Sequence, residues 1–542
     1  MNINKKNIKR CLVLLLFIIS PLTIFAQDQL SVNIQDPIYS ILEICSIRGV
    51  LPQISYVKPF NTGNIKEYIK STLGNRMRLN DYEVVILKNA YDSYLNDDIG
   101  LRFFAGEESE IRAAFSRNNS FHSVNMIQGG IIGTLGPSLA YNMNLGVFLD
   151  KVDPEAFAPY DFTKKWDGFH VWSVEGKVLY SDGINDHLNF SFNTLPELSL
   201  DILDSKGNLK IARLRREWGV GDGSLSLSGT ARPIEAITGS IRPNSWSNFH
   251  FLTGILGNWQ DKLNEQKMFS IHRLEMFPFE WLYLSPWESV VWAKRMELSY
   301  LNPLMSYFMG QQIIGDVDNI ALGGDVAITI APYIRLYFSL FIDELIISEL
   351  KGFFQRLNNQ YAWQVGFKIP LPSLPFFLLT FQYTKIEPYS YTHYPQELPQ
   401  YSNSININFS HDGENIGYHL PPNSDEFLIK VSSYPISGLA ATVQYQLIRH
   451  GTGDHLKGQI EGDINIWLDY GTISDYPPKD FLHDGIYEWI NIFKVNISYT
   501  FPSLQTTVWG EYSYVNVRNY WNIQGNDVVK NLIGLGIKIN TW

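Results

Sequence analysis

The sequence predicts an all-β transmembrane barrel of antiparallel strands, preceded by a small N-terminal α-helical subdomain. Three observations predict it: aromatic residues make up 14% of the chain although mean hydropathy is only −0.10, apolar residues alternate with period two over most of the length, and long connections alternate with short ones. Strands that show apolar side chains to lipid and polar ones to water produce this combination. After residue 26 no apolar run approaches the ~18 residues of a spanning helix, so a membrane crossing requires a closed barrel.

Residues 1–26 have the pattern of a secretory signal peptide. Four basic residues precede the apolar run 12–19, and the small residue Ala26 stands at the expected cleavage point. Removing these four basic residues from the net charge of −11 leaves −15 for the mature chain, which argues against nucleic acid as a partner. Cys45 would be the one remaining cysteine, so the mature chain can form no internal disulfide.

The helical subdomain is predicted over residues 27–105. Pro37 opens and Gly49 closes a first amphipathic helix, a second runs over 64–73, and a third follows the capping residue Asn80. Together they amount to ~60 residues, which is marginal for independent folding. We therefore expect the helices to pack on something larger.

The barrel is predicted over residues 106–542. The segments 333–343, 376–385 and 488–501 alternate apolar and polar residues strictly, and the last strand, 529–542, ends the chain on an aromatic residue. The strand count from these patterns lies between sixteen and twenty. A soluble β-sandwich or large soluble barrel is the alternative interpretation of the alternation itself.

Two kinds of connection separate the strands. Short ones carry turn residues, as at 136–138, 331–332 and 501–503. Long polar ones cover 151–168, 217–233, 295–318, 388–426 and 451–488. Outer-membrane barrels have short periplasmic turns and long outer loops, so this asymmetry favours a membrane barrel over a soluble sheet.

A search for catalytic patterns is mostly negative. No metalloprotease motif, phosphate loop or pairing of His and Cys at metal spacing is present. His411 with Asp412, and His450 with Asp454 and His455, suggest the weaker hypothesis of a membrane hydrolase. No serine or cysteine is placed as its nucleophile.

The segment 217–233, EWGVGDGSLSLSGTARP, combines glycine with Trp, Arg and Asp and fits neither a helix nor a strand. Arginine binds carboxylates and phosphates bidentately, and tryptophan offers an apolar face to sugar rings, so one interpretation is a site for an anionic saccharide. The other is structural: arginines inside barrels pair with acids across the lumen. The basic and aromatic residues in and around the segment are Arg213, Arg215, Arg216, Trp218, Arg232, Arg242 and Trp246; the acids at hand are Glu217, Asp222 and Glu235.

Three further loops are also rich in polar and aromatic residues. They cover 299–319, 411–427 and 467–489. Their carboxylates and amides could bind calcium, but the spacing fits no established ligand loop, and solvated loop polarity is the simpler interpretation. We expect no cofactor and no metal.

Several motifs, in their order, resemble the Wzi-type capsule assembly family in its Bacteroidetes-like form. They are WGVGDGSLSLSGTARP, RLEMFP from Arg273, YLNP and GDVDN within 299–319, and HDGENIGYHLPPNSDE from His411. The resemblance implies an outer-membrane barrel of eighteen strands, a small periplasmic helical bundle and extracellular loops that close the pore. It also implies a lectin that holds capsular polysaccharide at the cell surface and is not an enzyme. Arg213, Arg216, Trp218, Asp222 and Arg232 are the ligand positions carried over by motif.

Our leading hypothesis is therefore a monomeric, non-catalytic surface lectin of a Gram-negative outer membrane that anchors or helps assemble capsular or extracellular polysaccharide. The alternative is an outer-membrane porin or glycan-export channel. Expected partners are that polysaccharide, outer-membrane lipid and the barrel assembly machinery. The candidate residues for polysaccharide binding or for a lumen plug are Arg213, Arg216, Trp218, Asp222, Arg232, Asn302, Asp316, Asp318, His411, Asp412, Asn423 and Asp425.

Overall fold

The computed structural model describes most of the chain after its first 25 residues. The described residues are 26–94, 101–117, 119–135, 138–152, 187–203, 206–257, 267–293, 295–315, 317–345, 354, 356, 359–394, 406–412, 414–451, 479, 481–482 and 486–541. Residues 1–25, which carry most of the expected signal peptide, lie outside this set, as do Asp316, Asp454 and His455.

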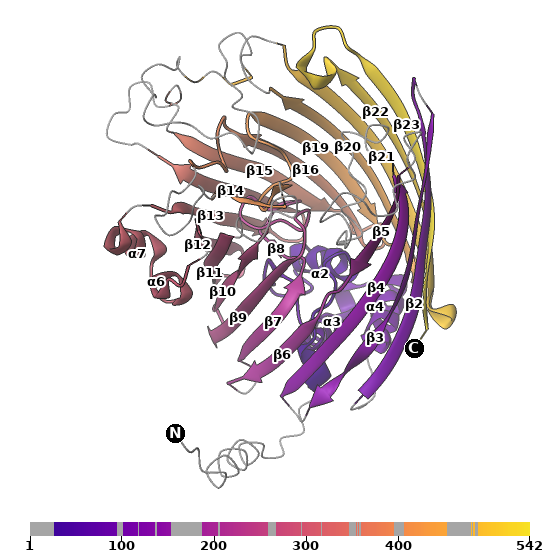
Figure 1. Cartoon of the computed structure of the whole chain (residues 1–542). Helices are drawn as coiled ribbons and strands as arrows, with labels where there is room; N and C mark the ends of the chain where they lie inside the picture. The colour runs from indigo at the N-terminus through magenta and orange to yellow at the C-terminus, as the bar shows by residue number, and fades with distance from the viewer. Residues whose placement is uncertain are drawn as a thin grey trace, which may run out of the picture.

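All but four short strands of the described residues form one closed antiparallel barrel in which neighbours in sequence are mostly neighbours in space (Figure 1). The first barrel strand pairs with the last, Ala105 opposite Thr541, which closes the ring. Segments β5 and β6 both pair with β4, so they act as one interrupted strand and the barrel has eighteen. This confirms the predicted fold class.

The bounds of the barrel strands are β2 (Leu101–Phe115), β3 (Ser120–Leu135), β4 (Leu139–Val152), β5 (His187–Asn193), β6 (Glu197–Ile202), β7 (Gly207–Leu214), β9 (Ile234–Asn244), β10 (Ser247–Leu256), β11 (Lys267–Phe279), β12 (Leu282–Ala293), β13 (Asn319–Ile330), β14 (Ile334–Glu344), β15 (Gln360–Pro370), β16 (Phe377–Ile386), β19 (Ser424–Ser433), β20 (Leu439–His450), β21 (Glu488–Phe501), β22 (Thr506–Arg518) and β23 (Val528–Thr541).

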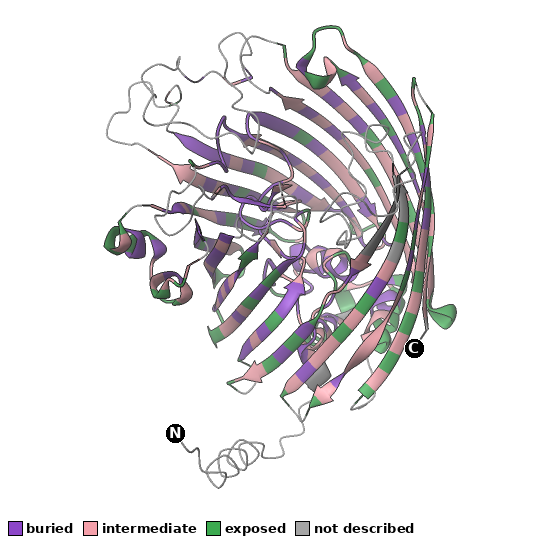
Figure 2. Cartoon of the chain, viewed as in Figure 1, coloured by how far each residue is buried: buried purple, intermediate pink, exposed green. Residues whose placement is uncertain are grey.

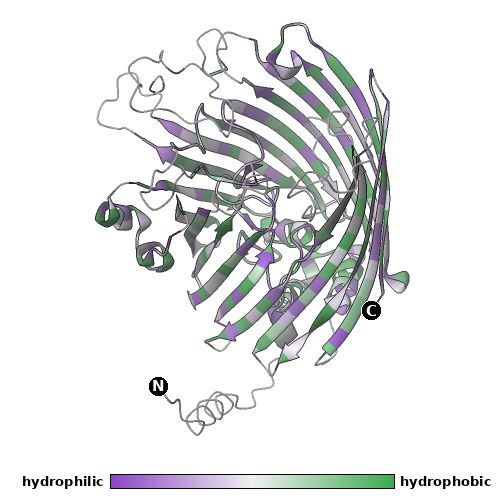
Figure 3. Cartoon of the chain, in the orientation of Figure 1, coloured by the Kyte–Doolittle hydropathy of each residue, from purple (hydrophilic) through white to green (hydrophobic). Residues whose placement is uncertain are grey.

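Alternation along the strands separates an apolar outer wall from a mostly buried inner one (Figures 2 and 3). In β14, Leu336 and Phe338 are exposed while Arg335, Tyr337 and Ser339 are buried. The apolar set predicted from the alternation therefore faces outward. Polar side chains of the strands point into a filled interior.

The connections separate the two ends of the barrel. One end, here called the short-turn end, carries brief links such as 280–281, 331–333 and 434–438. The other, the long-loop end, carries 153–186, 215–233, 257–266, 294–318, 345–359, 387–423 and 451–487. The predicted asymmetry is present, and β2 begins and β23 ends at the short-turn end.

The N-terminal residues form a helical block inside the ring, toward the short-turn end (Figure 1). Its elements are η1 (Ala26–Gln29), α2 (Ile38–Ile47), α3 (Thr62–Gly74), η2 (Arg76–Arg78) and α4 (Asp81–Tyr94), with strand β1 (Val57–Lys58) between α2 and α3. The barrel strand β2 starts at Leu101, so the predicted boundary between residues 105 and 106 falls inside β2. None of the described helices is long and apolar enough to cross a membrane.

The helical block is held to the wall by an apolar core and by buried charges. Leu42, Cys45 and Ile69 pack in one cluster with Phe376 and Leu378 of the barrel. Burial opposes ionisation of Glu43, but Lys368, 2.7 Å from its carboxylate, together with Lys58 and Arg335 outweighs this and holds the pKa of Glu43 below its usual range. The block is thus part of the barrel interior and not a separate domain on a linker.

The remaining elements are short. Strand β8 (Glu217–Trp218) and the hairpin of β17 (Ser410–His411) and β18 (Glu414–Asn415) belong to long-loop connections, as do α6 (Leu298–Leu301) and α7 (Tyr307–Ile314). The 3-10 turns η8 (Pro502–Leu504) and η9 (Tyr520–Asn522) follow β21 and β22.

Candidate functional site

Residues 215–233, which we name the plug segment, run through the interior of the barrel. The segment connects β7 to β9 at the long-loop end, and its strand β8 pairs with β1 of the helical block, Trp218 opposite Val57. Trp218 is only 1% exposed and donates its backbone N–H to the carbonyl of Leu227, 2.8 Å away. The segment therefore doubles back on itself inside the lumen.

Glycines let the plug segment approach both the wall and the 387–423 connection closely. A Cβ on Gly221 would meet the Gln364 amide oxygen at 1.9 Å, and one on Gly223 would meet the ring of Tyr418 at 2.7 Å. Gly223 also has a φ of +87°, a conformation that favours glycine. The glycine content that marked this segment in the sequence thus has a packing explanation.

Polar side chains from three neighbouring strands on the far wall hold the tip of the plug segment. Gln382 of β16 accepts from the Asp222 backbone N–H at 2.8 Å and donates to its carbonyl at 3.0 Å. Lys430 of β19 lies 2.8 Å from the Asp222 carboxylate, and Lys368 of β15 donates to the carbonyl of Val220 at 3.1 Å. Burial would raise the pKa of Asp222, but Lys430 outweighs it and the pKa is lowered.

An aromatic cluster inside the lumen packs against the plug segment. Tyr391 and Phe409, from the 387–423 connection, pack on Phe341 of β14 with ring centroids 4.4 and 5.3 Å away. Leu225 of the plug segment belongs to the same cluster and its carbonyl accepts from the Tyr391 hydroxyl at 3.0 Å. Two connections from the long-loop end thus meet inside the ring of strands.

The predicted arginines contact other groups of the protein itself. Arg216 is 3% exposed and donates to the carbonyls of Leu214 and Ile234, at 3.0 and 2.9 Å, so it joins the ends of β7 and β9. Arg213 donates to the Thr194 carbonyl at 2.9 Å. Arg232 lies 3.8 Å from Glu414 of β18.

The carboxylate of Glu217 forms a hydrogen bond within the plug segment. Its Oε2 accepts from the Gly229 backbone N–H at 2.6 Å, while Oε1 is buried. Burial raises the pKa of Glu217 to about 7, against the opposing effects of Lys58 and of the Gly229 hydrogen bond.

His411 is enclosed with both ring nitrogens in use. Its Nδ1 accepts from the Gly257 N–H at 3.0 Å, and Nε2 faces the Pro233 carbonyl at 3.2 Å, with Asp412 at 3.7 Å. Burial lowers the pKa of His411, although Asp412 acts in the opposite direction. A neutral imidazole held in this way joins three connections and is not poised as a general base.

The candidates of the 294–318 connection lie apart from the plug segment. Asp318 is buried, accepts from Arg295 at 2.5 and 2.9 Å and from the Tyr300 hydroxyl at 2.9 Å, and so braces α6. Asn302 is exposed and caps the turn after α6 through the Leu304 N–H at 3.1 Å. The structure does not bring these two residues together with Arg216 or Trp218.

Asn423 joins two long connections to each other, and Asp425 joins neighbouring strands of the wall. The fully buried Asn423 side chain donates to the Gly451 carbonyl at 2.9 Å and accepts from the Leu482 N–H at 2.8 Å. Asp425 accepts from the Tyr383 hydroxyl at 2.8 Å and pairs with Arg449. Among the described residues, no group of three or more His, Cys, Asp or Glu side chains could hold a metal ion.

Sequence reasoning missed Glu275 of β11, which connects the helical block to the wall. Its carboxylate accepts from Ser55, from the Tyr56 N–H and from Tyr283, and contacts His250, all within 3.0 Å. Ser55 and Tyr56 lie 220 and 219 residues before Glu275 in the chain, and Glu275 sits in the quoted RLEMFP motif without a local sign of its role. Only the packing of the helical block inside the barrel brings them together.

Comparison with solved structures supports the fold. The structure of Wzi, an outer-membrane protein involved in group 1 capsule assembly in Escherichia coli and a carbohydrate-binding β-barrel, is similar with a TM-score of 0.58, at 12% identity over 93% of this chain and 98% of that one. OccAB2 of Acinetobacter baumannii gives a TM-score of 0.44 at 10% identity, covering 81% and 98%, and OccK10 of Pseudomonas aeruginosa 0.40 at 8%, covering 81% and 99%. No protein-family model matches the sequence, and no curated protein matches it.

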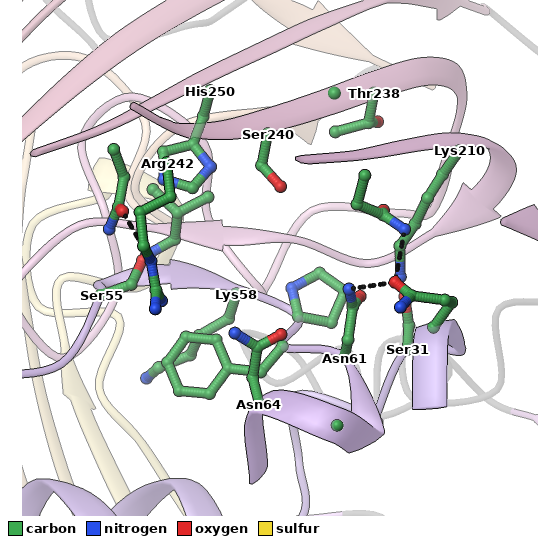
Figure 4. A pocket seen from close by; sticks show the side chains of 18 of the residues that line it. Ser31, Ser55, Lys58, Asn61, Asn64, Lys210, Thr238, Ser240, Arg242 and His250 are labelled. Atoms are coloured by element: carbon green, nitrogen blue, oxygen red, sulfur yellow. Dashed lines mark hydrogen bonds between the residues drawn. The ribbon is translucent and has the colours of Figure 1, made fainter. Parts of the chain in front are cut away.

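A polar cavity of about 320 Å³ opens between the helical block and strands β7, β9 and β10 (Figure 4). Arg242, at the short-turn end of β9, lines it together with Lys58, Lys210, Arg216 and His250. Arg242 and Trp246, grouped in the sequence with the plug arginines, are thus near the opposite end of the barrel from the long loops. Trp246 is half exposed in the β9–β10 turn.

A second cavity, of about 700 Å³, lies at the rim of the long-loop end. Its lining includes Phe308 and Gln311 of α7, Asp318, Glu344 and Tyr394. Phe308 is 49% and Tyr394 37% exposed, so two aromatic rings and several amide and carboxylate oxygens face the same space.

Proposed function

We propose that this protein is an outer-membrane barrel whose long-loop end faces the outside of a Gram-negative cell and whose helical block faces the periplasm. The outward apolar side chains of strands such as β14 and the contrast between short turns and long loops support this placement. In this membrane it is a monomer that reaches its site through the barrel assembly machinery.

We propose further that the protein is a non-catalytic surface lectin that anchors or helps assemble capsular or extracellular polysaccharide. The observation that carries this is the attachment of the plug segment to the far wall. Lys430 forms an ion pair with the Asp222 carboxylate, and Gln382 accepts a hydrogen bond from the Asp222 backbone N–H. A segment that crosses the interior and is held on both sides narrows the lumen between the described strands, so we take the long-loop end as the working surface.

The rim cavity is the surface best suited to a saccharide. Tyr394 and Phe308 present aromatic faces on which sugar C–H groups pack, and Gln311 and Glu344 supply polar partners for hydroxyls. The predicted residues Arg216, Trp218 and Asp222 act in this proposal by closing the lumen. The capsule-assembly barrel Wzi, which shares the fold, is itself described as carbohydrate binding.

The enclosed geometry of His411 supports a role without hydrolysis. Both of its ring nitrogens have partners, and its contacts with Gly257 and Pro233 lie within the connections. We expect a His411→Gln variant to lose stability and to change no hydrolytic activity on polysaccharide.

Two measurements test the proposal. In planar bilayers the purified protein should pass almost no current, whereas a variant with residues 219–230 replaced by a shorter Gly-Ser link should conduct. Deleting the gene should release polysaccharide into the medium, and the Tyr394→Ala protein should restore cell-bound polysaccharide poorly. Steady wild-type conductance would favour the porin or export channel, and unchanged retention after deletion would rule out the lectin.

A further inference from the structure

The 320 Å³ cavity at the short-turn end concentrates positive charge in an acidic protein. Five Lys and Arg side chains line it, namely Lys58, Lys206, Lys210, Arg216 and Arg242, against two acids, Asp28 and Glu67. The whole chain carries a net charge of −11. Local charge of the opposite sign to that of the protein is the condition under which an anion can approach and remain.

The carboxylates around the cavity neutralise only part of this charge. Lys210 is paired with Glu197 at 2.8 Å, and Asp28 is engaged by Lys66, which does not line the cavity, at 2.5 Å. Within the described part of the chain, no ion pair is recorded for Lys58, Lys206 or Arg242. Glu67 is then the one lining acid not engaged elsewhere.

Arg216 lines the cavity, and one of its hydrogen-bond donors has no partner in the described structure. Its terminal nitrogens donate to backbone carbonyls and to Thr238, but the buried Nε has no hydrogen-bond partner in the described structure. A buried donor without a partner is costly, which makes an acceptor brought by a ligand favourable.

The same space also carries groups that suit a sugar ring. Figure 4 shows Asn61, Asn64, Ser31 and Ser240 around the cavity together with Lys58 and Arg242. The partly exposed ring of Tyr68 lines it as well. Amides and hydroxyls match sugar hydroxyls, and an aromatic ring offers a face to sugar C–H groups, neither of which a bare inorganic anion would use.

We propose that this cavity binds a carboxylate-bearing saccharide unit, a uronate, at the short-turn end of the barrel. Lys58, Lys206 and Arg242 meet the carboxylate, and the Asn and Ser side chains meet the ring hydroxyls. The volume is at the lower end of the range of about 300–1,000 Å³ usual for small-molecule sites, so one or two sugar units fit. The inference deepens the proposed function, because it gives the glycan an acidic component and a second contact remote from the long loops.

The test uses the full-length mature chain in detergent micelles. Binding of D-glucuronate is measured by calorimetry and by saturation-transfer NMR, with D-glucose and sulfate as probes of ring and charge alone. We expect glucuronate to bind more tightly than either, and more weakly as salt is raised. Lys206 and Arg242 are exposed, so the K206Q/R242Q protein should fold normally and lose at least about tenfold in affinity.

A matched control removes two exposed lysines of the helical block that do not line the cavity, as K70Q/K88Q, and should bind as the wild type does. Sulfate binding as tight as glucuronate, no glucuronate binding, or equal affinity in K206Q/R242Q at an unchanged melting temperature would each overturn the inference. Loss of cell-surface retention in Tyr394→Ala tests the long-loop end separately, so failure of the proposed function and failure of this site give different results.

Discussion

Val57 of the N-terminal block and Trp218 of the plug segment are register partners in a two-stranded sheet inside the barrel. This pairing joins the two parts of the chain that fill the lumen. Trp218 also packs beside His250 of β10, with ring centroids 6.1 Å apart. One buried indole therefore contacts the helical block, the plug segment and the wall.

The Trp218→Ala variant should loosen the plug segment. Removing a fully buried indole costs about 3–5 kcal/mol, because the surrounding groups only partly close the space that is left. We expect the free energy of unfolding in detergent to fall by that amount and brief current openings to appear in planar bilayers.

Trp246→Ala is the matched control, since Trp246 is half exposed in the β9–β10 turn. It should change the free energy of unfolding by less than about 0.5 kcal/mol and produce no openings. Equal effects of the two substitutions would mean that Trp218 does not hold the segment.

The barrel could be predicted from the sequence because its physical cause is local. The alternation of exposed Leu336 and Phe338 with buried Tyr337 follows directly from a strand with an outward and an inward face, and most strands pair with their neighbours in sequence. The exact strand number could not be derived in this way. The interruption between β5 and β6, which both pair with β4, leaves no local signal.

The contacts of the candidate site depend on long-range pairing and were beyond sequence reasoning. The plug segment could be singled out by composition, since its glycines are required for close approach. That Asp222 meets Lys430, or that Glu43 meets Lys368, follows only from the closure of the ring. For the same reason Arg242 could not be separated from Arg216, although the structure places it at the far end of β9.

The folded conformation of the plug segment should become less stable as pH rises. Burial raises the pKa of Glu217 to about 7 from an ordinary value near 4.5, so the folded form favours the protonated acid. This contribution to stability is fully present below about pH 4.5 and is lost as pH rises through about 7. Amide exchange across 217–233, corrected for intrinsic rates, should therefore show less protection at pH 8 than at pH 5.

The Glu217→Gln variant should remove this dependence, because the amide keeps an acceptor for the Gly229 N–H without titrating. Among the charged groups around Glu217 is Asp222, whose pKa is lowered below its usual range by Lys430, so that carboxylate stays ionised between pH 5 and pH 8. A pH dependence that persists in Glu217→Gln would assign the effect to another group.

Asn423 should be the most sensitive position among the long connections. Its side chain contacts both Gly451 and Leu482, and its φ of 55° suits asparagine better than alanine. Asn423→Ala leaves two buried backbone groups without partners, at about 1–3 kcal/mol each. Amide exchange at Leu482 should speed up accordingly, whereas Asn302→Ala, at an exposed turn, should leave it unchanged.

A charged substitution on the outer wall should destabilise the protein more in the middle of a strand than at its end. Phe338 lies in the middle of β14 and is 42% exposed on the outward face, whereas Ile330 lies at the short-turn end of β13. In a bilayer, Lys should cost about 2–4 kcal/mol at the first position and about 0–1 kcal/mol at the second. Denaturant unfolding of Phe338→Lys and Ile330→Lys in phospholipid vesicles measures both. Because the two side chains are similarly exposed, a wall in water would give equally small costs, and that result would contradict the membrane placement.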